Sequence, residues 1–398
     1  MIDRRQALAR TGLLAASVAF LPRRDRPELS VSPSRVADVS DQEIERWLRL
    51  ANVPSMSLVQ VDGDRVSTRA VGIPRKGETT PVSADTAYAA ASLTKSVFAY
   101  TFLSFVEDGE IELDRPLREY LPLPNPADAR AQSITARHLL SHSSGWRNWR
   151  NSSTDELTAA VVPGTRWSYS GEGFFFLQRV LEKVTGKAIG TLVRERVFAP
   201  LSMTRSSLLI TEAIEPQLAA PHNGDGDVRT PYGRAALEAM RRAMAARNAT
   251  LDEVRVEDAE AALHATAPSL AVLPNYLSPN AAASLITTAA DFGRFLRHLV
   301  TARAAGGRPA AIVAQMLAPQ VRCNEVIQWG LGAGIETANG SDALWQWGDN
   351  PGYKNFYFAN PTTGRAVAVF TNGDRGQRVY ERVIRAVSGA DRAAFLFL

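Results

Sequence analysis

The sequence predicts an α+β fold in which one antiparallel β-sheet is built from both ends of the chain and is flanked by helices, with a mainly helical region inserted between the two ends. Three observations carry this prediction. Two strand-like runs flank Asp62-Gly63-Asp64, which is typical of a β-hairpin. Short β-rich segments separated by Gly, Asn and Pro fill residues 330–373. The residues between these two regions show mostly the apolar spacing of helices.

Individual elements follow from the same patterns. In residues 41–51, Ile44, Trp47 and Leu48 share one helical face. Helices are predicted over residues 41–51, 92–107, 135–141, 173–184, 189–197, 287–300 and 380–387, and C-terminal strands over 330–337, 343–349, 354–361 and 365–373. The sheet-containing part is therefore expected to comprise residues 36–110 and 325–398, and the mainly helical part residues 111–324.

Residues 233–265 form a distinct segment of the helical part. The segment is rich in alanine and charged residues and has no strand pattern, so it is expected to form one or two surface helices inserted in the fold. A lid or an interaction face is possible for such an insert, and a solvated helical decoration is the simpler interpretation.

The composition is that of a folded protein with one large domain or two closely packed ones. Of the 398 residues, 45% are hydrophobic and 22% are charged. The net charge is only +4, and no Lys/Arg-rich run with interleaved aromatic residues occurs, so nucleic acid is not an expected partner. The single cysteine, Cys323, excludes an intrachain disulfide and a cysteine-based metal site.

Residues 1–27 are expected to be a twin-arginine-type signal peptide and the start of a linker. Arg4-Arg5 precedes a short apolar stretch, and Ser17-Val18-Ala19 supplies the small residues of a cleavage site. This stretch is too short to cross a bilayer, and no other segment has the roughly 20 apolar residues that a span requires. The sequence thus favours a periplasmic or secreted mature protein without a membrane span, and a frayed basic N-terminus is the alternative.

Ser92 and Lys95 are the first candidates for catalysis. A serine hydroxyl needs a base within reach and donors for an oxyanion before it can act as a nucleophile. At a helix start the backbone N–H groups lack intrahelical partners, and a lysine at i+3 lies on the same face as the serine. A lysine in a dry pocket can lose its proton and serve as the base. The Ser-x-x-Lys spacing alone occurs readily by chance, so it needs support from the rest of the chain.

That support is an ordered set of landmarks over roughly residues 50–375. With ASLTKSVFA at 91–99, they resemble those of the serine β-lactamase and penicillin-binding-protein superfamily, on the branch of class C β-lactamases, esterases and D-amino-acid peptidases. The others are LDRPLREYLP (113–122), ITARHLLSHSSGW (134–146), PGTRWSYSGEGFFFLQRVLEKVTGK (163–187), APLSMTRS (199–206), LITTAADFGRFL (285–296) and WGDNPGYKNF (347–356). The resemblance implies the β-lactamase/transpeptidase-like version of the predicted fold.

The resemblance also implies roles for three residues. Ser92 would be the nucleophile, Lys95 its proton-shuttling partner, and Tyr169, which matches the tyrosine of the family's Tyr-x-Asn motif, would assist proton transfer at the leaving group. Such a role for Tyr169 leads us to expect that nearby Lys95 lowers the pKa of its phenol. A core aromatic beside Trp167 and Phe174 is the alternative for Tyr169.

By the same resemblance, the backbone N–H groups of Ser92 and Asp349 would form the oxyanion hole, beside the strand residues Gln346, Trp347 and Gly348. This third motif opens with lysine or histidine in the family, where the lysine favours a substrate carboxylate, and here Gln346 stands at that position. Asp349 adds a negative charge beside the hole, which Lys354 or an arginine would have to balance.

The second motif departs from the family as well. The family's asparagine, which binds a substrate amide, is Gly171 here. Together the two departures favour an exported serine hydrolase that forms an acyl-enzyme on a small-molecule ester, amide or peptide that is neutral near the scissile bond. The alternatives are a D-Ala-D-Ala carboxypeptidase or β-lactamase, and a catalytically silent binding or regulatory homologue.

No metal or organic cofactor is expected. His138 and His142 have an i, i+4 spacing that can suit zinc, but no glutamate accompanies them in a His-Glu-x-x-His pattern. Packing or helix capping is the favoured interpretation for both histidines.

Overall fold

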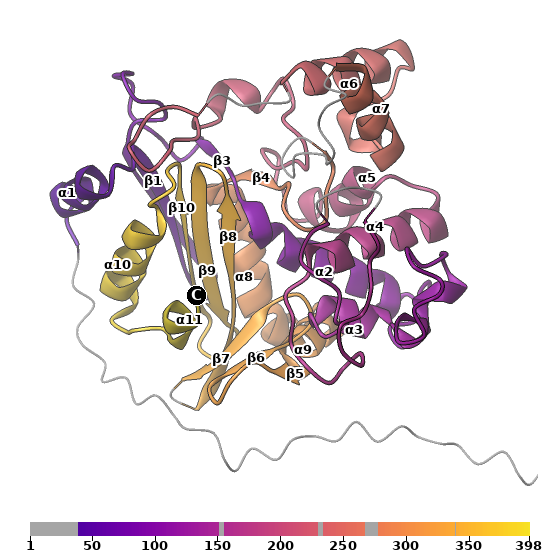
Figure 1. Cartoon of the computed structure of the whole chain (residues 1–398). Helices are drawn as coiled ribbons and strands as arrows, with labels where there is room; N and C mark the ends of the chain where they lie inside the picture. The colour runs from indigo at the N-terminus through magenta and orange to yellow at the C-terminus, as the bar shows by residue number, and fades with distance from the viewer. Residues whose placement is uncertain (1–38, 151–154, 230–233, 267–277, 339) are drawn as a thin grey trace, which may run out of the picture.

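The computed structural model describes residues 39–150, 155–229, 234–266, 278–338 and 340–398 (Figure 1). The predicted signal peptide lies outside these residues. Within them, no helix combines the length and apolar character needed to cross a membrane.

An eight-stranded antiparallel sheet lies at the centre, in the order β2-β1-β10-β9-β8-β7-β6-β5. The strands are β1 (Ser55–Asp62), β2 (Arg65–Gly72), β5 (Val321–Arg322), β6 (Ile327–Trp329), β7 (Gly334–Ala338), β8 (Ser341–Asn350), β9 (Tyr353–Asn360) and β10 (Arg365–Thr371). Because β1 pairs with both β2 and β10, the N-terminal hairpin and the C-terminal strands form one sheet. This confirms the predicted sheet built from both ends of the chain.

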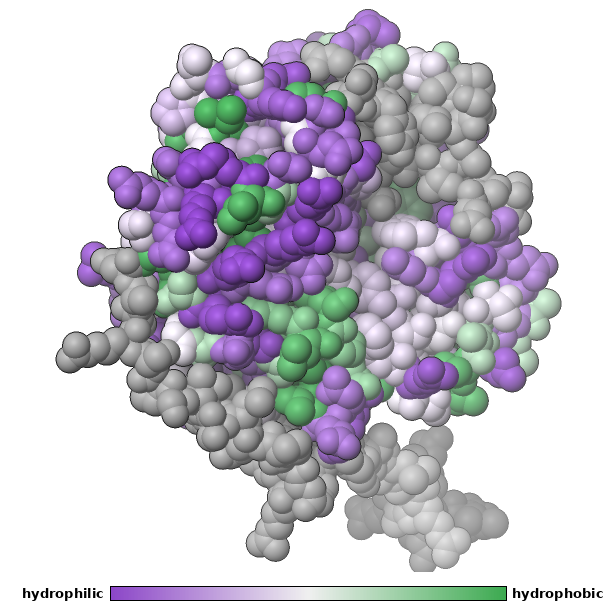
Figure 2. Space-filling model, turned by 60° about the vertical axis from the view of Figure 1, so that its left-hand side comes forward, coloured by the Kyte–Doolittle hydropathy of each residue, from purple (hydrophilic) through white to green (hydrophobic). Residues whose placement is uncertain are grey.

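Helices cover both faces of the sheet (Figure 1). One face packs against α1 (Asp41–Ala51), α10 (Gln377–Ser388) and α11 (Ala393–Phe397), and the other against α2 (Thr94–Glu107), α8 (Ala289–Ala305) and α9 (Gly307–Leu317). Successive side chains of a strand point to opposite faces. Accordingly, Phe356 joins the core beneath α10 while Tyr357 joins the core beneath α8. The surface in Figure 2 is largely hydrophilic, with apolar side chains gathered in places.

The helical part contains α3 (Ala136–Leu140), α4 (Gly171–Thr185) and α5 (Ile189–Val193). The predicted helix over 189–197 is present, and its second half, Arg194–Phe198, is π-helical. A small sheet of β3 (Ala87–Ala89) and β4 (Ile286–Thr288) was not predicted, since three residues are too few to show a strand period. This small sheet joins the start of α8 to the segment that leads into α2.

Of the one or two helices expected in the insert, the described residues form two, α6 (Arg234–Ala246) and α7 (Val256–Thr266), with a 3-10 turn at Leu251–Glu253 between them. Leu237, Met240 and Met244 of α6 pack on Leu209 and Ile210 in a separate small core. The insert is therefore anchored to the fold by one apolar face.

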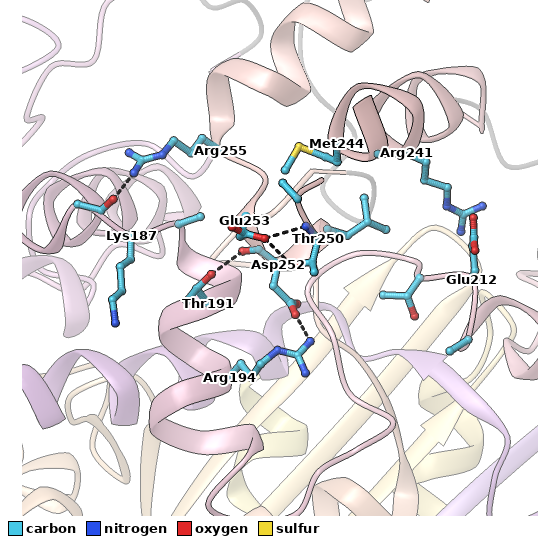
Figure 3. Close-up of a pocket in the computed structure, with 17 residues that line it drawn as sticks. Lys187, Thr191, Arg194, Glu212, Arg241, Met244, Thr250, Asp252, Glu253 and Arg255 are labelled. Atoms are coloured by element: carbon cyan, nitrogen blue, oxygen red, sulfur yellow. Dashed lines mark hydrogen bonds and ion pairs between the residues drawn. The ribbon is translucent and has the colours of Figure 1, made fainter. Parts of the chain in front are cut away.

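A cavity of about 1030 Å³ is lined by residues of the insert and of α5 and its neighbours (Figure 3). Two of its cations are already paired: Arg194 with Asp252, and Arg241 with Glu215 at 2.9 Å. Neither Ser92 nor Lys95 lines this cavity, so the candidate site lies elsewhere in the molecule.

Candidate active site

Ser92 lies in a 3-10 turn, Ala91–Leu93, directly before α2. The sequence predicted that the helix begins at Ser92, whereas α2 begins at Thr94. Ala91 has a left-handed backbone, with φ of 52°, a conformation that costs a non-glycine residue about 1–3 kcal/mol. The Thr94 hydroxyl holds the turn, because it donates to the Ala91 carbonyl at 2.5 Å and accepts from the Leu285 N–H at 2.9 Å. The turn thereby presents Ser92 from a fixed backbone.

Lys95 is fully buried one turn beyond Ser92. Its Nζ lies 3.1 Å from Ser92 Oγ and 2.8 Å from the carbonyl oxygen of Ala282. Desolvation lowers the pKa of Lys95 well below the ordinary value for lysine. A neutral amine can donate to Ala282 and direct its lone pair at the Ser92 hydroxyl, so this arrangement suits a proton acceptor.

Tyr169 lies two residues before α4, and its ring lies near the Lys95 amine. The Ser170 hydroxyl caps α4 by accepting from the Gly173 N–H at 3.1 Å, which fixes the chain next to Tyr169. Lys95 Nζ is 4.8 Å from the centre of the Tyr169 ring, and the phenol oxygen is 3.5 Å from Gln346 Nε2.

The expectation that the site lowers the pKa of Tyr169 was wrong. Burial raises the pKa of Tyr169 above its ordinary value, although hydrogen bonds with Ser92 and Gln346 oppose this effect. The physical reason is that a buried phenolate loses its hydration, and this cost outweighs the stabilisation that its hydrogen-bond partners provide. Burial thus favours the uncharged phenol of Tyr169 and the uncharged amine of Lys95.

Strand β8 passes alongside the Ser92 turn and brings the predicted third motif to it. Gln346 is fully buried and donates from Nε2 to the carbonyl of Ser92 at 3.3 Å. The ring of Trp347 lies 4.8 Å from that of Tyr169, centre to centre. At Gly348 a Cβ atom would lie 2.3 Å from the carbonyl oxygen of Ala90, so only glycine allows this approach.

Asp349 is balanced by a neighbour across the hairpin. It pairs in register with Lys354 of β9, and the two side chains form an ion pair. The Asp349 side chain is 58% exposed. The negative charge beside the proposed oxyanion hole is thus solvated and countered by Lys354, which answers the question that the sequence raised.

The indole of Trp149 packs against Gly171, a contact that the sequence did not indicate. A Cβ atom at this position would lie 2.2 Å from Cζ2 of Trp149, and the Gly171 N–H donates to Asn148 Oδ1 at 2.9 Å. The indole of Trp149 therefore occupies the space that a side chain at position 171 would need. Nothing in the local sequence marks Trp149, because it lies 22 residues earlier in the chain.

The two histidines have the packing and capping roles that were favoured. His138 Nδ1 accepts from the Thr135 N–H at 3.2 Å in a capping box at the start of α3. His142 is fully buried, accepts from the Ser170 N–H at 3.0 Å, and lies 4.2 Å from the Tyr169 ring, centre to centre. His142 therefore supports the backbone and ring of the tyrosine segment.

Comparison with curated proteins gives partial matches. Penicillin-binding protein 4 of Amycolatopsis lactamdurans is 32% identical over 190 residues, covering 44% of this chain and 50% of the relative. Esterase EstB of Burkholderia gladioli is 30% identical over 222 residues, covering 48% of this chain and 55% of the relative. The chain thus spans about half the length of the curated relatives it matches.

Solved structures share the fold. A penicillin-binding protein homologue from Pyrococcus abyssi has a TM-score of 0.66 at 18% identity, covering 88% of this chain and 77% of that one. The D-alanine carboxypeptidase AmpC from Burkholderia cenocepacia has a TM-score of 0.66 at 16% identity, covering 87% and 97%. These likenesses show the β-lactamase/transpeptidase fold that the resemblance implied.

The family model described as Beta-lactamase matches residues 43–390, which include Ser92, Lys95, Tyr169 and the whole of β8. The chain therefore belongs to the beta-lactamase family.

Proposed function

We propose that this protein is a serine hydrolase that acts through an acyl-enzyme on a small-molecule ester that is neutral near the scissile bond. The observation that carries the proposal is the buried Lys95 amine, 3.1 Å from Ser92 Oγ and with its pKa lowered by desolvation. A lysine kept neutral beside a serine hydroxyl is the activated nucleophile pair that acyl transfer needs.

The proposed reaction has two halves. Ser92 Oγ attacks the substrate carbonyl carbon while its proton passes to Lys95 Nζ, and the backbone N–H groups of Ser92 and Asp349 donate to the oxyanion. The proton then reaches the leaving oxygen by way of the Tyr169 phenol, and the acyl group stays on Ser92. Water attacks the ester of the acyl-enzyme, gives its proton to the same Lys95–Tyr169 pair, and Ser92 regains its own.

The proposal of a neutral substrate rests on two positions of the site that differ from the family motifs, Gln346 and Gly171. Gln346 places an uncharged amide beside Tyr169, and Lys354, the cation nearest in sequence, is engaged by Asp349. A substrate carboxylate at this end of the site would be desolvated without a partner at position 346, which costs several kcal/mol. Trp149 fills the space beside Gly171, so an amide-binding side chain is replaced by an apolar ring. An esterase among the relatives, EstB, is consistent with this proposal.

A second candidate keeps the same chemistry on D-Ala-D-Ala peptides or β-lactams. It is favoured by the relatives, which include the Escherichia coli D-alanyl-D-alanine-carboxypeptidase/endopeptidase AmpH, 26% identical over 196 residues. A catalytically silent homologue is the third possibility, and the neutral Lys95 amine beside Ser92 speaks against it.

A substrate panel on one preparation separates these candidates. Nitrophenyl esters of short and aromatic acids, nitrocefin and a D-Ala-D-Ala peptide are assayed under the same conditions. We expect kcat/KM for the best ester to exceed that for nitrocefin and for the peptide by at least about 100-fold, because only the ester needs no cation at position 346. Efficient nitrocefin hydrolysis with little ester hydrolysis would overturn the neutral-substrate proposal.

The close approach of β8 to the Ser92 turn supplies a further prediction. We expect Gly348→Ala to lower kcat/KM for the best ester about 10-fold to 100-fold, because the new methyl group pushes β8 away from Ala90 and a displacement of about 1 Å can cost this much. The same overpacking should lower stability by about 1–3 kcal/mol. Ester kinetics and thermal unfolding measure the two effects.

Gly224→Ala is the matched control, because the atom nearest to a Cβ there belongs to the Arg375 side chain, at an ordinary contact distance of 3.4 Å. This variant should keep both kcat/KM for the best ester and the thermal stability close to the wild-type values. Wild-type activity in Gly348→Ala would mean that the strand can retreat without disturbing the site.

A further inference from the structure

Gln178 of α4 is a fully buried amide that joins this helix to the segment 279–283. Its Nε2 donates to the carbonyl of Pro279 at 2.9 Å, and its Oε1 accepts from the N–H of Ala281 at 2.9 Å. One side chain thus satisfies two backbone groups of a segment about a hundred residues further along the chain.

The orientation of this amide is determined by its partners. The Ala281 N–H can only donate and the Pro279 carbonyl can only accept, so the amide has one arrangement that satisfies both. Glu182, one turn further along α4, accepts from Gln178 Nε2 at 3.2 Å through Oε1, which also accepts from the Ile189 N–H at 3.0 Å. Burial raises the pKa of Glu182 to about 7, and both of its acceptor contacts oppose that shift.

The bridged segment supplies the carbonyl that contacts the lysine. Ala282 lies directly after Ala281, and its carbonyl oxygen is 2.8 Å from Lys95 Nζ. The next carbonyl, that of Ala283, accepts from Asn350 Nδ2 at 3.1 Å, which ties the segment to the end of β8. The Gln178 amide is therefore two residues of backbone away from the acceptor that directs the Lys95 amine.

We propose that Gln178 is a positioning residue, which holds the Ala282 carbonyl against Lys95 Nζ and so keeps the amine dry and directed at Ser92. The inference rests on the proposed roles of Ser92 and Lys95 and adds what holds the base in place. Gln178 itself touches neither the nucleophile nor the substrate. Its contribution to the reaction passes through the Ala281–Ala282 backbone.

Gln178→Met tests this role. Methionine keeps the volume but leaves the Pro279 carbonyl and the Ala281 N–H without partners, and buried polar groups in that condition draw in water. Water near Lys95 weakens the desolvation that lowers its pKa. We therefore expect the acid limb of the pH profile of kcat/KM for the best ester to move to higher pH. At the wild-type optimum, kcat should fall about 10-fold to 100-fold while KM changes less than about threefold.

Thr101→Val is the matched control, because Thr101 is a buried residue of α2 whose hydroxyl donates only within its helix, to Val97 at 3.0 Å. It should lower the melting temperature and leave the acid limb in place. If Gln178→Met lowers the melting temperature but leaves the limb unmoved, the residue is merely structural and the proposal is overturned. If Gln178→Met does not fold, Gln178→Asn gives the same readout, because the shorter amide cannot bridge the Pro279 carbonyl and the Ala281 N–H together.

The outcomes distinguish a failure of the proposed hydrolase function from a failure of the positioning role of Gln178. Wild-type protein that hydrolyses no ester and takes no fluorophosphonate label contradicts the proposed function, whatever Gln178 does. Active wild-type protein whose Gln178 variants keep the wild-type acid limb contradicts only the positioning role.

Discussion

Ser92→Ala is expected to abolish covalent labelling by a fluorophosphonate probe and to lower kcat/KM for the best ester by at least about 10⁴-fold. The methyl group cannot form the acyl-enzyme, and removal of the nucleophile from an acyl-transfer site leaves only the contribution of oxyanion stabilisation and binding. Labelling followed by mass spectrometry of the intact protein, together with ester kinetics, measures both effects.

The control is Ser104→Ala, on the same helix. Ser104 is buried and donates to the Thr101 carbonyl at 2.6 Å, well away from the lysine. The Ser104→Ala variant should be labelled by the fluorophosphonate probe at the wild-type rate. A label that persists on Ser92→Ala would place the nucleophile on another residue, and a folded wild type that takes no label would sink the enzyme proposal.

Lys95→Met is expected to lower kcat/KM about 10³-fold and at the same time to raise the melting temperature at neutral pH. The loss follows from removal of the proton acceptor, since general-base catalysis contributes about 10²–10⁴-fold. The higher melting temperature follows from the linkage between protonation of Lys95 and folding. Between the lowered pKa of Lys95 in the folded protein and its ordinary value, the unfolded chain binds a proton that the folded chain does not.

In that pH window the buried lysine therefore makes stability rise with increasing pH, and at neutral pH it destabilises the fold. Methionine removes this cost, so the variant should unfold at a higher temperature than wild type at pH 7, with a smaller difference near pH 10. Lys183→Met on the exposed face of α4 is the control and should change neither activity nor this pH dependence. Inactivation with a lower melting temperature at every pH would show instead that Lys95 holds the fold together as a cation.

The N-terminal hairpin and the long helices could be predicted from the sequence because their causes are local. Asp62-Gly63-Asp64 carries its own turn chemistry, and Gly63 adopts the left-handed φ of 57° that such a turn requires. Thr288 caps α8 through the Asp291 N–H at 3.1 Å, a contact three residues along the chain. The pairing of Ser92 with Lys95 is equally local, since one helical turn brings the two side chains together.

Other features depend on residues far apart in the chain, and no sequence window contains them. The strands β3 and β4 exist only because residues 87–89 meet residues 286–288. Trp149 reaches Gly171, the first residue of α4, from an earlier loop, and the Gln178 amide binds a segment about a hundred residues away. The predicted lowering of the Tyr169 pKa failed for a related reason, because solvation depends on everything packed around a group.

The sequence by itself determined which residues could be nucleophile and base, and that strands from both ends of the chain share one sheet. Only the tertiary structure decided the surroundings of these residues. Burial lowers the pKa of Lys95 and raises that of Tyr169, Asp349 pairs with Lys354, and Trp149 occupies the space beside Gly171. The physical reason is that turn chemistry and helical spacing act over a few residues. Desolvation and close packing are properties of the assembled core, to which distant segments contribute together.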